Sequence, residues 1–221
     1  KKFFRRVFSL YFCRWKLKEK YLNSYVLGLM ATDGSMVLDK KYYKEIIEVA
    51  DEQIISDVAN HFSIGYSHRK RIINNKERHF YSVRIPKYVY EGNEECFRGN
   101  REGLFEVYQK SNKLNFMRGI FDGDGTVSGV PNSKTLLRIG FSVNFKHSGI
   151  LKIILDFMRE HSIKVNTYLD KRGGKSYYIS INNKADVNKF FNLIYSNAKL
   201  YLKRKYNIFI LRGFPDLVTN Q

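Results

Sequence analysis

Two stretches of the chain share one pattern: Val26-Leu27-Gly28-Leu29-Met30-Ala31-Thr32-Asp33-Gly34 and Met117-Arg118-Gly119-Ile120-Phe121-Asp122-Gly123-Asp124-Gly125. In each stretch a glycine precedes an aspartate by five residues, and another glycine follows that aspartate. The pattern predicts a helix that ends at its Asp-Gly pair. A single Asp-Gly pair usually marks only a turn, but two in register indicate an internal duplication.

The spacing within each stretch has a physical reason. A glycine inside a helix costs about 1 kcal/mol relative to alanine. Close packing of the two helices at Gly28 and Gly119 would account for that cost. Asp33 and Asp124 would then meet at two helix C-termini, each of which carries partial negative charge. Such a concentration of carboxylate and carbonyl oxygens predicts a bound hard cation such as Mg²⁺, which can activate water at a phosphate.

Each stretch opens the same order of predicted elements. In the first half these are strands at Met36–Asp39 and Tyr42–Val49, a helix at 51–62, and strands at Tyr66–Ile73 and Arg78–Ile85. In the second half they are strands at Val127–Val130 and Leu136–Phe145, a helix at Gly149–His161, strands at Lys164–Leu169 and Ser176–Ile181, and helices at 184–196 and 199–211.

The predicted fold class is α+β with two similar halves. The first half is expected at 21–112 and the second at 113–221. Within the first half, residues 86–111 are expected to be an irregular linker or insertion that becomes helical from about Arg101. Residues 1–20 are predicted to form a basic amphipathic helix, which either packs with its charged face outward or contacts phosphate.

Composition narrows the class of protein. The 221 residues are 43% hydrophobic, which is ample for a core and excludes a wholly disordered basic tail. No apolar run approaches the roughly 18 residues of a membrane span. The two cysteines cannot form a disulfide framework and lie in no zinc-binding spacing, which favours a reducing intracellular compartment.

The net charge of +18 is unevenly distributed. Residues 1–20 contain eight basic residues and one acidic residue, and residues 113–221 contain 18 basic and 7 acidic residues. Residues 21–112 are neutral overall, with 13 basic and 13 acidic residues. A polyanionic partner explains this imbalance better than solubility does, because binding to phosphates releases counterions. Nucleic acid is therefore the predicted partner.

On these motifs the sequence resembles the LAGLIDADG homing endonuclease family, in a form with both motifs in one chain. The resemblance covers roughly residues 21–210 and includes the tail from Tyr195-Ser196-Asn197-Ala198 to Tyr201-Leu202-Lys203-Arg204-Lys205-Tyr206-Asn207. It implies a monomer with two αββαββα halves, whose motif helices form the central interface and whose two antiparallel sheets form a saddle over DNA. One departure is Ala31, which stands where the family motif has an earlier aspartate.

The resemblance also implies an activity and a metal site. The family cuts both strands of a long, often asymmetric DNA site and leaves 3′ overhangs. Asp33 and Asp124 would bind Mg²⁺, or Mn²⁺ or Ca²⁺ in its place, across the scissile phosphates. The main-chain carbonyls of Thr32 and Gly123 would be supporting ligands. Lys146, near a strand-to-helix junction, is the candidate for polarising water or phosphate, with an ordinary exposed lysine as the alternative. Asp51 is expected to cap or begin a helix instead.

DNA contacts are expected from outward-facing strand residues, because successive side chains of a strand alternate between its faces. Arg69 and Arg71 would point together, and so would Lys76 and Arg78. The full set of candidates is Arg69, Arg71, Lys76, Arg78, Arg84, Arg138, Lys171, Arg172, Lys175 and Tyr177. Arginine suits bidentate contacts to guanine, whereas loop lysines suit phosphate.

Two other functions remain open for the same fold. One is an intron maturase that binds the host intron RNA, and the other is a DNA-binding regulator without catalysis. The retention of both motif carboxylates favours the endonuclease over both. All three functions place the protein inside the cell with nucleic acid, in bacterial or phage-infected cytoplasm or in an organelle matrix.

Overall fold

The computed structural model describes residues 23–39, 42–97, 101–129, 137–170 and 175–218. The predicted helix over residues 1–20 lies outside the described part of the chain. The described residues form two four-stranded antiparallel sheets with the same order of strands, β1-β2-β4-β3 and β5-β6-β8-β7. The predicted α+β class and the duplication of two sheets are thus confirmed.

The first half begins with a helix over residues 23–33, here called the first motif helix. It continues with these elements: β1 (Gly34–Asp39), β2 (Tyr42–Val49), α2 (Glu52–Phe62), β3 (Tyr66–Ile73) and β4 (Lys76–Arg84). The turn between β3 and β4 is Asn74-Asn75, and both residues have positive φ, as a tight hairpin turn requires.

A connecting segment leads from β4 to the second half. It contains two short 3₁₀ helices and one α-helix: η1 (Lys87–Val89), η2 (Glu94–Phe97) and α3 (Leu104–Lys110). Helix α3 packs against α5 of the second half. This segment carries buried side chains, such as those of Leu104 and Tyr108.

The second half repeats the first and adds two closing helices. Its elements are α4 (Lys113–Asp124), β5 (Gly125–Gly129), β6 (Leu137–Asn144), α5 (Ser148–Glu160), β7 (Asn166–Asp170), β8 (Ser176–Ile181), α6 (Lys184–Tyr195) and α7 (Lys203–Ile210). Helix α4 carries the second motif and is capped by Asn112, whose side chain accepts a hydrogen bond from the main-chain N–H of Asn115.

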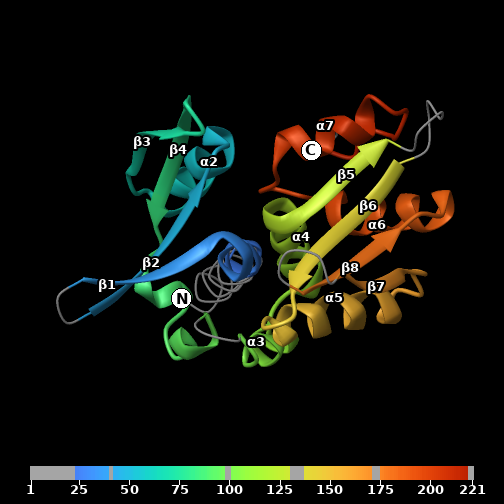
Figure 1. Ribbon diagram of the computed structural model, residues 1–221, viewed down its shortest axis with the longest axis horizontal. Coiled ribbons are helices and arrows are strands. Elements are labelled where there is room, and N and C mark those ends of the chain that lie inside the picture. The colour runs from blue at the N-terminus through green and yellow to red at the C-terminus, as the bar shows by residue number, and fades with distance from the viewer. Residues whose placement is uncertain (1–22, 40–41, 98–100, 130–136, 171–174, 219–221) are drawn as a thin grey trace, which may run out of the picture.

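The two motif helices lie side by side between the two sheets (Figure 1). A Cβ atom built on Gly28 would lie 3.1 Å from the Cα of Gly119. One built on Gly119 would lie 2.6 Å from the main-chain nitrogen of Leu29. The helices therefore touch backbone to backbone, and any side chain at either glycine would force them apart. This is the close approach that the sequence predicted.

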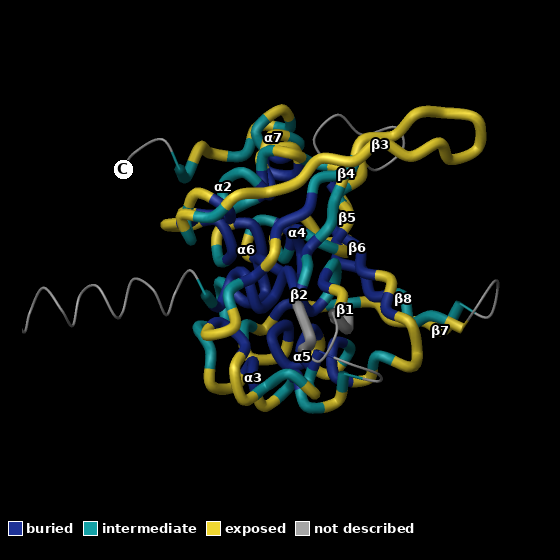
Figure 2. Tube along the Cα trace, turned by 90° about the vertical axis from the view of Figure 1, so that its left-hand side faces the viewer, coloured by how far each residue is buried: buried dark blue, intermediate teal, exposed yellow. Residues whose placement is uncertain are grey.

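Each sheet has one face covered by helices and one open face. In β6 the residues Leu137, Ile139, Phe141 and Val143 are buried, whereas Arg138, Ser142 and Asn144 are exposed. Helices α5 and α6 cover the buried face of this sheet, and α2 covers the corresponding face of the first sheet. The β3–β4 hairpin projects beyond the body of the protein and is exposed over most of its length (Figure 2).

One hydrophobic core runs through both halves and through the motif helices. Aromatic rings dominate its centre, where Phe121 of α4 contacts the rings of Phe141, Phe190 and Tyr195. None of the described helices combines the length and the apolar character that a transmembrane segment needs.

Candidate active site at the ends of the motif helices

The structure brings the two motif carboxylates together. A Cβ atom built on Gly123 would lie 2.6 Å from Oδ2 of Asp33, which places the end of α4 against the end of the first motif helix. Asp124 is the last residue of α4. Two residues that are 91 positions apart in the sequence thus share one site, because the glycine contacts let the helix axes approach closely.

Both carboxyl groups are held in an environment that disfavours their charge. Burial raises the pKa of Asp33 to about 6, and the negative charge of Asp124 contributes to the rise. Burial also raises the pKa of Asp124, although its side chain keeps an exposed side. Lys205 and Arg101 act in the opposite direction on both groups. A bound cation would relieve the remaining repulsion.

Lys205 belongs to α7, and its side chain reaches the C-terminus of α4. The residue is buried, with only 4% of its surface exposed. Its Nζ donates hydrogen bonds to the main-chain carbonyls of Phe121 at 2.6 Å, Asp122 at 2.7 Å and Gly123 at 3.2 Å. Three donors therefore meet three acceptors. Burial lowers the pKa of Lys205 to about 8, while the nearby aspartates favour its charged form. The lysine offsets the negative end of the helix dipole.

Arg101 plays a similar part at the first motif helix. Its guanidinium donates to the main-chain carbonyls of Ala31 and Gly34, the latter at 3.4 Å. Burial lowers its pKa, and the carboxylates of Glu45, Asp124 and Asp33 favour its charged form. Each motif helix therefore ends against one cation, the buried Lys205 or the half-buried Arg101.

The segment from Tyr201 to Lys205 links the two halves of the protein. The main-chain N–H of Lys203 donates to Oε1 of Gln53 on α2 at 2.9 Å, and Gln53 donates back to the carbonyl of Tyr201 at 3.2 Å. Arg204 pairs with Asp51 at 3.2 Å. These contacts fix the start of α7, and therefore Lys205, relative to the first half.

Asp122, the earlier aspartate of the second motif, is not part of the exposed site. It is buried and accepts hydrogen bonds from Tyr25 at 2.9 Å, Tyr195 at 3.4 Å and the main-chain N–H of Leu202 at 2.8 Å. Burial raises the pKa of Asp122, while the hydrogen bonds from Leu202 and Tyr25 and the charge of Lys205 act in the opposite direction. Asp122 thus joins the motif helices to the C-terminal segment.

The two residues considered for supporting roles, Lys146 and Asp51, lie just before α5 and α2. Lys146 is exposed in the turn between β6 and α5, so its catalytic role stays a prediction. The next residue, His147, interacts electrostatically with Asp124; burial and the charge of Arg101 lower its pKa. Asp51 occupies the expected N-cap position of α2, although its carboxylate makes no cap hydrogen bond and binds Arg204 instead.

The sequence analysis did not identify either of these two cations as part of the site. A signal existed for Lys205, because it lies at core spacing with Leu202, Tyr206 and Phe209, all of them buried. A lysine at a core position of an amphipathic helix indicates a buried role. Arg101 gives no such signal, since it lies in a loop and takes a positive φ of 59°.

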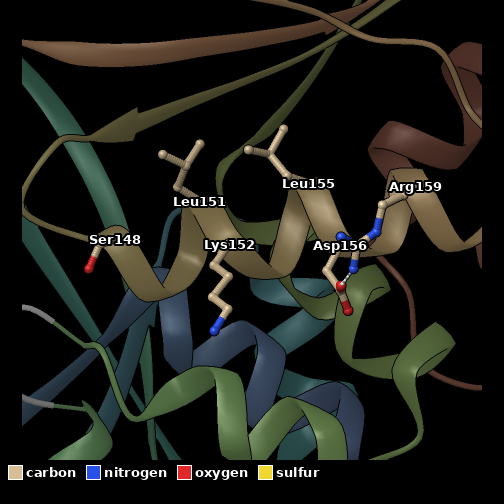
Figure 3. A pocket seen from close by; sticks show the side chains of 6 residues that line it. All are labelled: Ser148, Leu151, Lys152, Leu155, Asp156 and Arg159. Atoms are coloured by element: carbon tan, nitrogen blue, oxygen red, sulfur yellow. Dashed lines mark hydrogen bonds and ion pairs between the residues drawn. The ribbon is translucent and has the colours of Figure 1, made fainter.

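A cavity of about 300 Å³ opens beside Asp33. Its charged lining residues come from both halves: Asp33, Glu48, Asp51, Asp122 and Arg204. A second hollow, of about 390 Å³, follows the outer side of α5 (Figure 3). Its carboxylate, Asp156, already accepts from Gln109 at 3.1 Å and pairs with Arg159. Of these two cavities, the first is the one that contains a motif carboxylate.

The donor set at the helix ends fits a hard divalent cation. Within the described residues no cluster of three His, Cys, Asp or Glu side chains occurs. The available ligands are the carboxylates of Asp33 and Asp124 and nearby main-chain carbonyls. The carbonyl of Gly123 already accepts a bond from Lys205 but retains a second lone pair. Such an oxygen-only site with few protein ligands is typical of Mg²⁺, which keeps several waters.

The register of the first sheet puts its five candidate DNA-contacting residues on one face. Arg69 pairs with Phe80, and Arg71 pairs with Arg78, so these side chains project to the same side. Lys76 and Arg84 lie at even spacing from Arg78 along β4 and share that side. The opposite face holds Val83 and is covered by α2. All five candidates therefore lie on the open face.

In the second sheet the placement is mixed. Arg138 is on the open face. The expectation that Tyr177 faces outward is wrong, because Tyr177 pairs with Val143 on the helix-covered face and its neighbour Tyr178 takes the open side. Lys175 is exposed just before β8. Lys171 and Arg172 lie outside the described residues.

Comparison with known proteins agrees with this geometry. Residues 111–195 match the family model of the LAGLIDADG-like domain. The resemblance to the LAGLIDADG family is confirmed. A search of curated protein sequences found no match.

Several solved structures share the LAGLIDADG fold. The homing endonuclease I-WcaI bound to its DNA recognition sequence has a TM-score of 0.63 at 14% identity, with 86% of each chain covered. I-DmoI in complex with DNA and Ca has a TM-score of 0.53 at 16% identity, with 83% of this chain and 93% of that chain covered. The N-terminal LAGLIDADG domain of DUF199/WhiA has a TM-score of 0.51 at 16% identity, with coverages of 82% and 84%. At these identities the likeness shows the fold.

Proposed function

We propose that the protein is a site-specific endonuclease that binds double-stranded DNA and hydrolyses both strands with a divalent metal ion. The observation that carries this proposal is the pairing of Asp33 and Asp124 at the ends of two touching helices. One carboxylate comes from each half, so the two are related by an approximate twofold axis. The two strands of a DNA duplex are related in the same way, so each carboxylate can serve one strand. I-WcaI and I-DmoI, which share the fold, are homing endonucleases solved with DNA.

Each side chain of the site has a definite role in this proposal. Asp33 and Asp124 would hold Mg²⁺, with the carbonyls of Thr32 and Gly123 as supporting ligands. When bound, the metal would activate water and stabilise the leaving oxygen. The raised pKa of Asp33 supports this assignment, since a carboxyl group that resists ionisation alone gains most from a cation. I-DmoI was solved with Ca, which is consistent with divalent metal use in this fold.

Lys205 and Arg101 act as positioning residues in this proposal. All three protons of the Lys205 ammonium are engaged by carbonyls of α4, so it supports the helix end that presents Asp124. Arg101 supports the end that presents Asp33. Their charges also lower the repulsion between the carboxylates and would favour an approaching phosphate.

The target is proposed to be long and asymmetric, with 3′ overhangs left by a monomeric enzyme. The fold also occurs in DUF199/WhiA, which is described as a LAGLIDADG domain without an endonuclease name. Binding and cleavage therefore need separate measurements. A non-catalytic DNA-binding regulator is the alternative that this relative favours.

The test is cleavage of a plasmid library with randomised targets, in Mg²⁺, by the wild type and by the Asp33→Asn/Asp124→Asn double variant. We expect cuts at one long sequence with the wild type and none with the double variant. Binding of the recovered site, measured in Ca²⁺, should persist in both. Asp186→Asn, which alters a carboxylate in the first turn of α6, is the matched control and should cut normally. Equal cutting by the double variant would overturn the proposal, and site binding without cutting would favour the regulator.

A further inference from the structure

The open faces of the two sheets differ sharply in chemistry. On the first sheet, β3 and β4 turn five basic side chains to the open face: Arg69, Arg71, Lys76, Arg78 and Arg84. On the second sheet the described open-face residues are mostly uncharged: Thr126, Ser128, Arg138, Gly140, Ser142, Asn144, Asn166, Tyr168, Asp170, Ser176, Tyr178 and Ser180. Arg138 is the one basic residue among them.

Arg71 is held in place on the first open face. Its Nη2 lies 2.7 Å from Oε1 and 3.0 Å from Oε2 of Glu48 on β2. Its guanidinium carbon lies 4.9 Å from the centre of the Phe80 ring on β4. The side chain of Arg71 still has 46% of its surface exposed. A guanidinium fixed between a carboxylate and a ring presents its remaining donors in a set direction, as bidentate recognition of guanine requires.

The second open face centres on a pair of tyrosines instead. The rings of Tyr168 and Tyr178 lie 5.1 Å apart. A Cβ atom built on Gly140 would lie 2.5 Å from the hydroxyl of Tyr178, so Gly140 gives the room in which this ring lies across the sheet. Asn144 is exposed on the same face. Aromatic carbon suits the thymine methyl group, and asparagine suits adenine.

The second half is nevertheless strongly basic, at 18 basic against 7 acidic residues. Except for Arg138, the cations among its described residues lie outside the strands, as Lys146 and Lys175 do at strand ends. The sequence places Lys171 and Arg172 between β7 and β8. Cations at strand ends and in connections suit the phosphate backbone, whereas those within strands can reach base edges.

We infer that the two halves of the DNA target are read by different chemistry. Arg71, oriented by Glu48 and Phe80, reads a guanine under the first sheet. Tyr168 and Tyr178 read A·T base pairs under the second sheet. In that half-site the cations at strand ends and in connections bind the phosphates. This inference rests on the proposed binding of double-stranded DNA, and it specifies what each sheet recognises.

The test selects bound sequences from a randomised duplex library, using the full chain in Ca²⁺ so that binding is scored without cleavage. Arg71→Gln should lose the preference for one guanine, in one half-site, by about tenfold or more. Lys70→Gln is the matched control, because Lys70 is adjacent on β3 but faces the other side and pairs with Glu77 at 3.0 Å. It should leave the guanine preference unchanged.

The Glu48→Gln variant distinguishes the role of Glu48 in orienting Arg71 from its effect on the charge of the DNA-facing surface. Removing this carboxylate should weaken the guanine preference, since Arg71 loses its partner, but should tighten non-specific binding, since one negative charge leaves the DNA-facing surface. A variant that is merely unstable would weaken both. Tyr178→Leu should relax an A·T preference in the opposite half-site without changing the salt dependence of binding.

Specific results would overturn the inference. They are a uniform loss of affinity for all sequences with Arg71→Gln, effects of Arg71→Gln and Tyr178→Leu within the same half-site, or selection of no sequence at all. Selection of a site that the wild type then fails to cut in Mg²⁺ would instead overturn the proposed cleavage. The half-site assignment would still be judged from the selected sequences.

Discussion

Replacing a motif carboxylate should make the metal-free protein more stable while it abolishes cleavage. Asp33 is the clearest case, because burial and the charge of Asp124 raise its pKa to about 6 from 3.8. A carboxyl group with a raised pKa in the folded state binds its proton more tightly there than in the unfolded chain. Its ionisation therefore opposes folding.

The size of the effect follows from the pKa difference. One pKa unit corresponds to about 1.36 kcal/mol, so two units set an upper limit of about 3 kcal/mol. The penalty is absent below about pH 4, grows as the pH rises from about 4 to about 6, and is constant above that range. Asp33→Asn removes it. We expect the variant to exceed the wild type in unfolding free energy by about 1–3 kcal/mol at pH 8 and by almost nothing at pH 4.

The assay is urea unfolding of both proteins in EDTA across this pH range. Asp186→Asn serves as the control, since Asp186 lies in the first turn of α6. A carboxylate there is stabilised by the helix dipole, so this variant should lose about 0.3–1 kcal/mol. The reasoning would be refuted if Asp33→Asn were less stable than the wild type at pH 8, or if its advantage did not depend on pH.

Four further outcomes are expected. Because the pKa of Lys205 is lowered to about 8, plasmid cleavage should decline as the pH rises from about 7 to 9 while binding in Ca²⁺ persists, and a rate that still climbs at pH 9 would contradict this. Gly119→Ala should lower the unfolding free energy by about 2 kcal/mol or more, measured by urea titration, because the added methyl group meets the backbone of the facing helix. The control is Gly65→Ala, which has open space around it and should change the unfolding free energy by about 0.5 kcal/mol or less. A double-mutant cycle with Asp51→Asn and Arg204→Gln should give a coupling of about 0.2–1 kcal/mol that fades at high salt, because the pair is partly exposed. Ca²⁺ at one hundred times its dissociation constant should add about 2.7 kcal/mol to wild-type stability and nothing to the double aspartate variant, measured by calorimetry.

The fold was predictable because its decisive signals are local and repeated. The Gly-to-Asp spacing, the alternation of strands and the Asn74-Asn75 turn each act within a few residues. The hairpin of β3 and β4 starts at the predicted Tyr66, and β8 has the predicted bounds. Most other boundaries moved by one to three residues, which is the usual uncertainty of helix and strand ends.

The site was only partly predictable, because its remaining members depend on long-range contacts. Lys205 is 81 residues beyond Asp124 in the sequence, and Arg101 lies in a segment without periodicity. Strand register decides the direction of Tyr177, and a shift of one residue turns a side chain to the opposite face. Arg71 was chosen from alternation alone, but its partner Glu48 comes from a strand whose register the sequence does not specify.

The two halves repeat one fold but use equivalent positions differently. In the second motif, Asp122 binds Tyr25 and the N–H of Leu202; in the first, the same position is Ala31, whose carbonyl instead accepts from Arg101. Backbone contact between the motif helices requires glycine at both 28 and 119. The proposed metal would likewise require aspartate at both 33 and 124. Helix support and the proposed DNA reading lack that symmetry requirement. Because both halves belong to one chain, each could adapt to its own side of the asymmetric duplex that is proposed as the target.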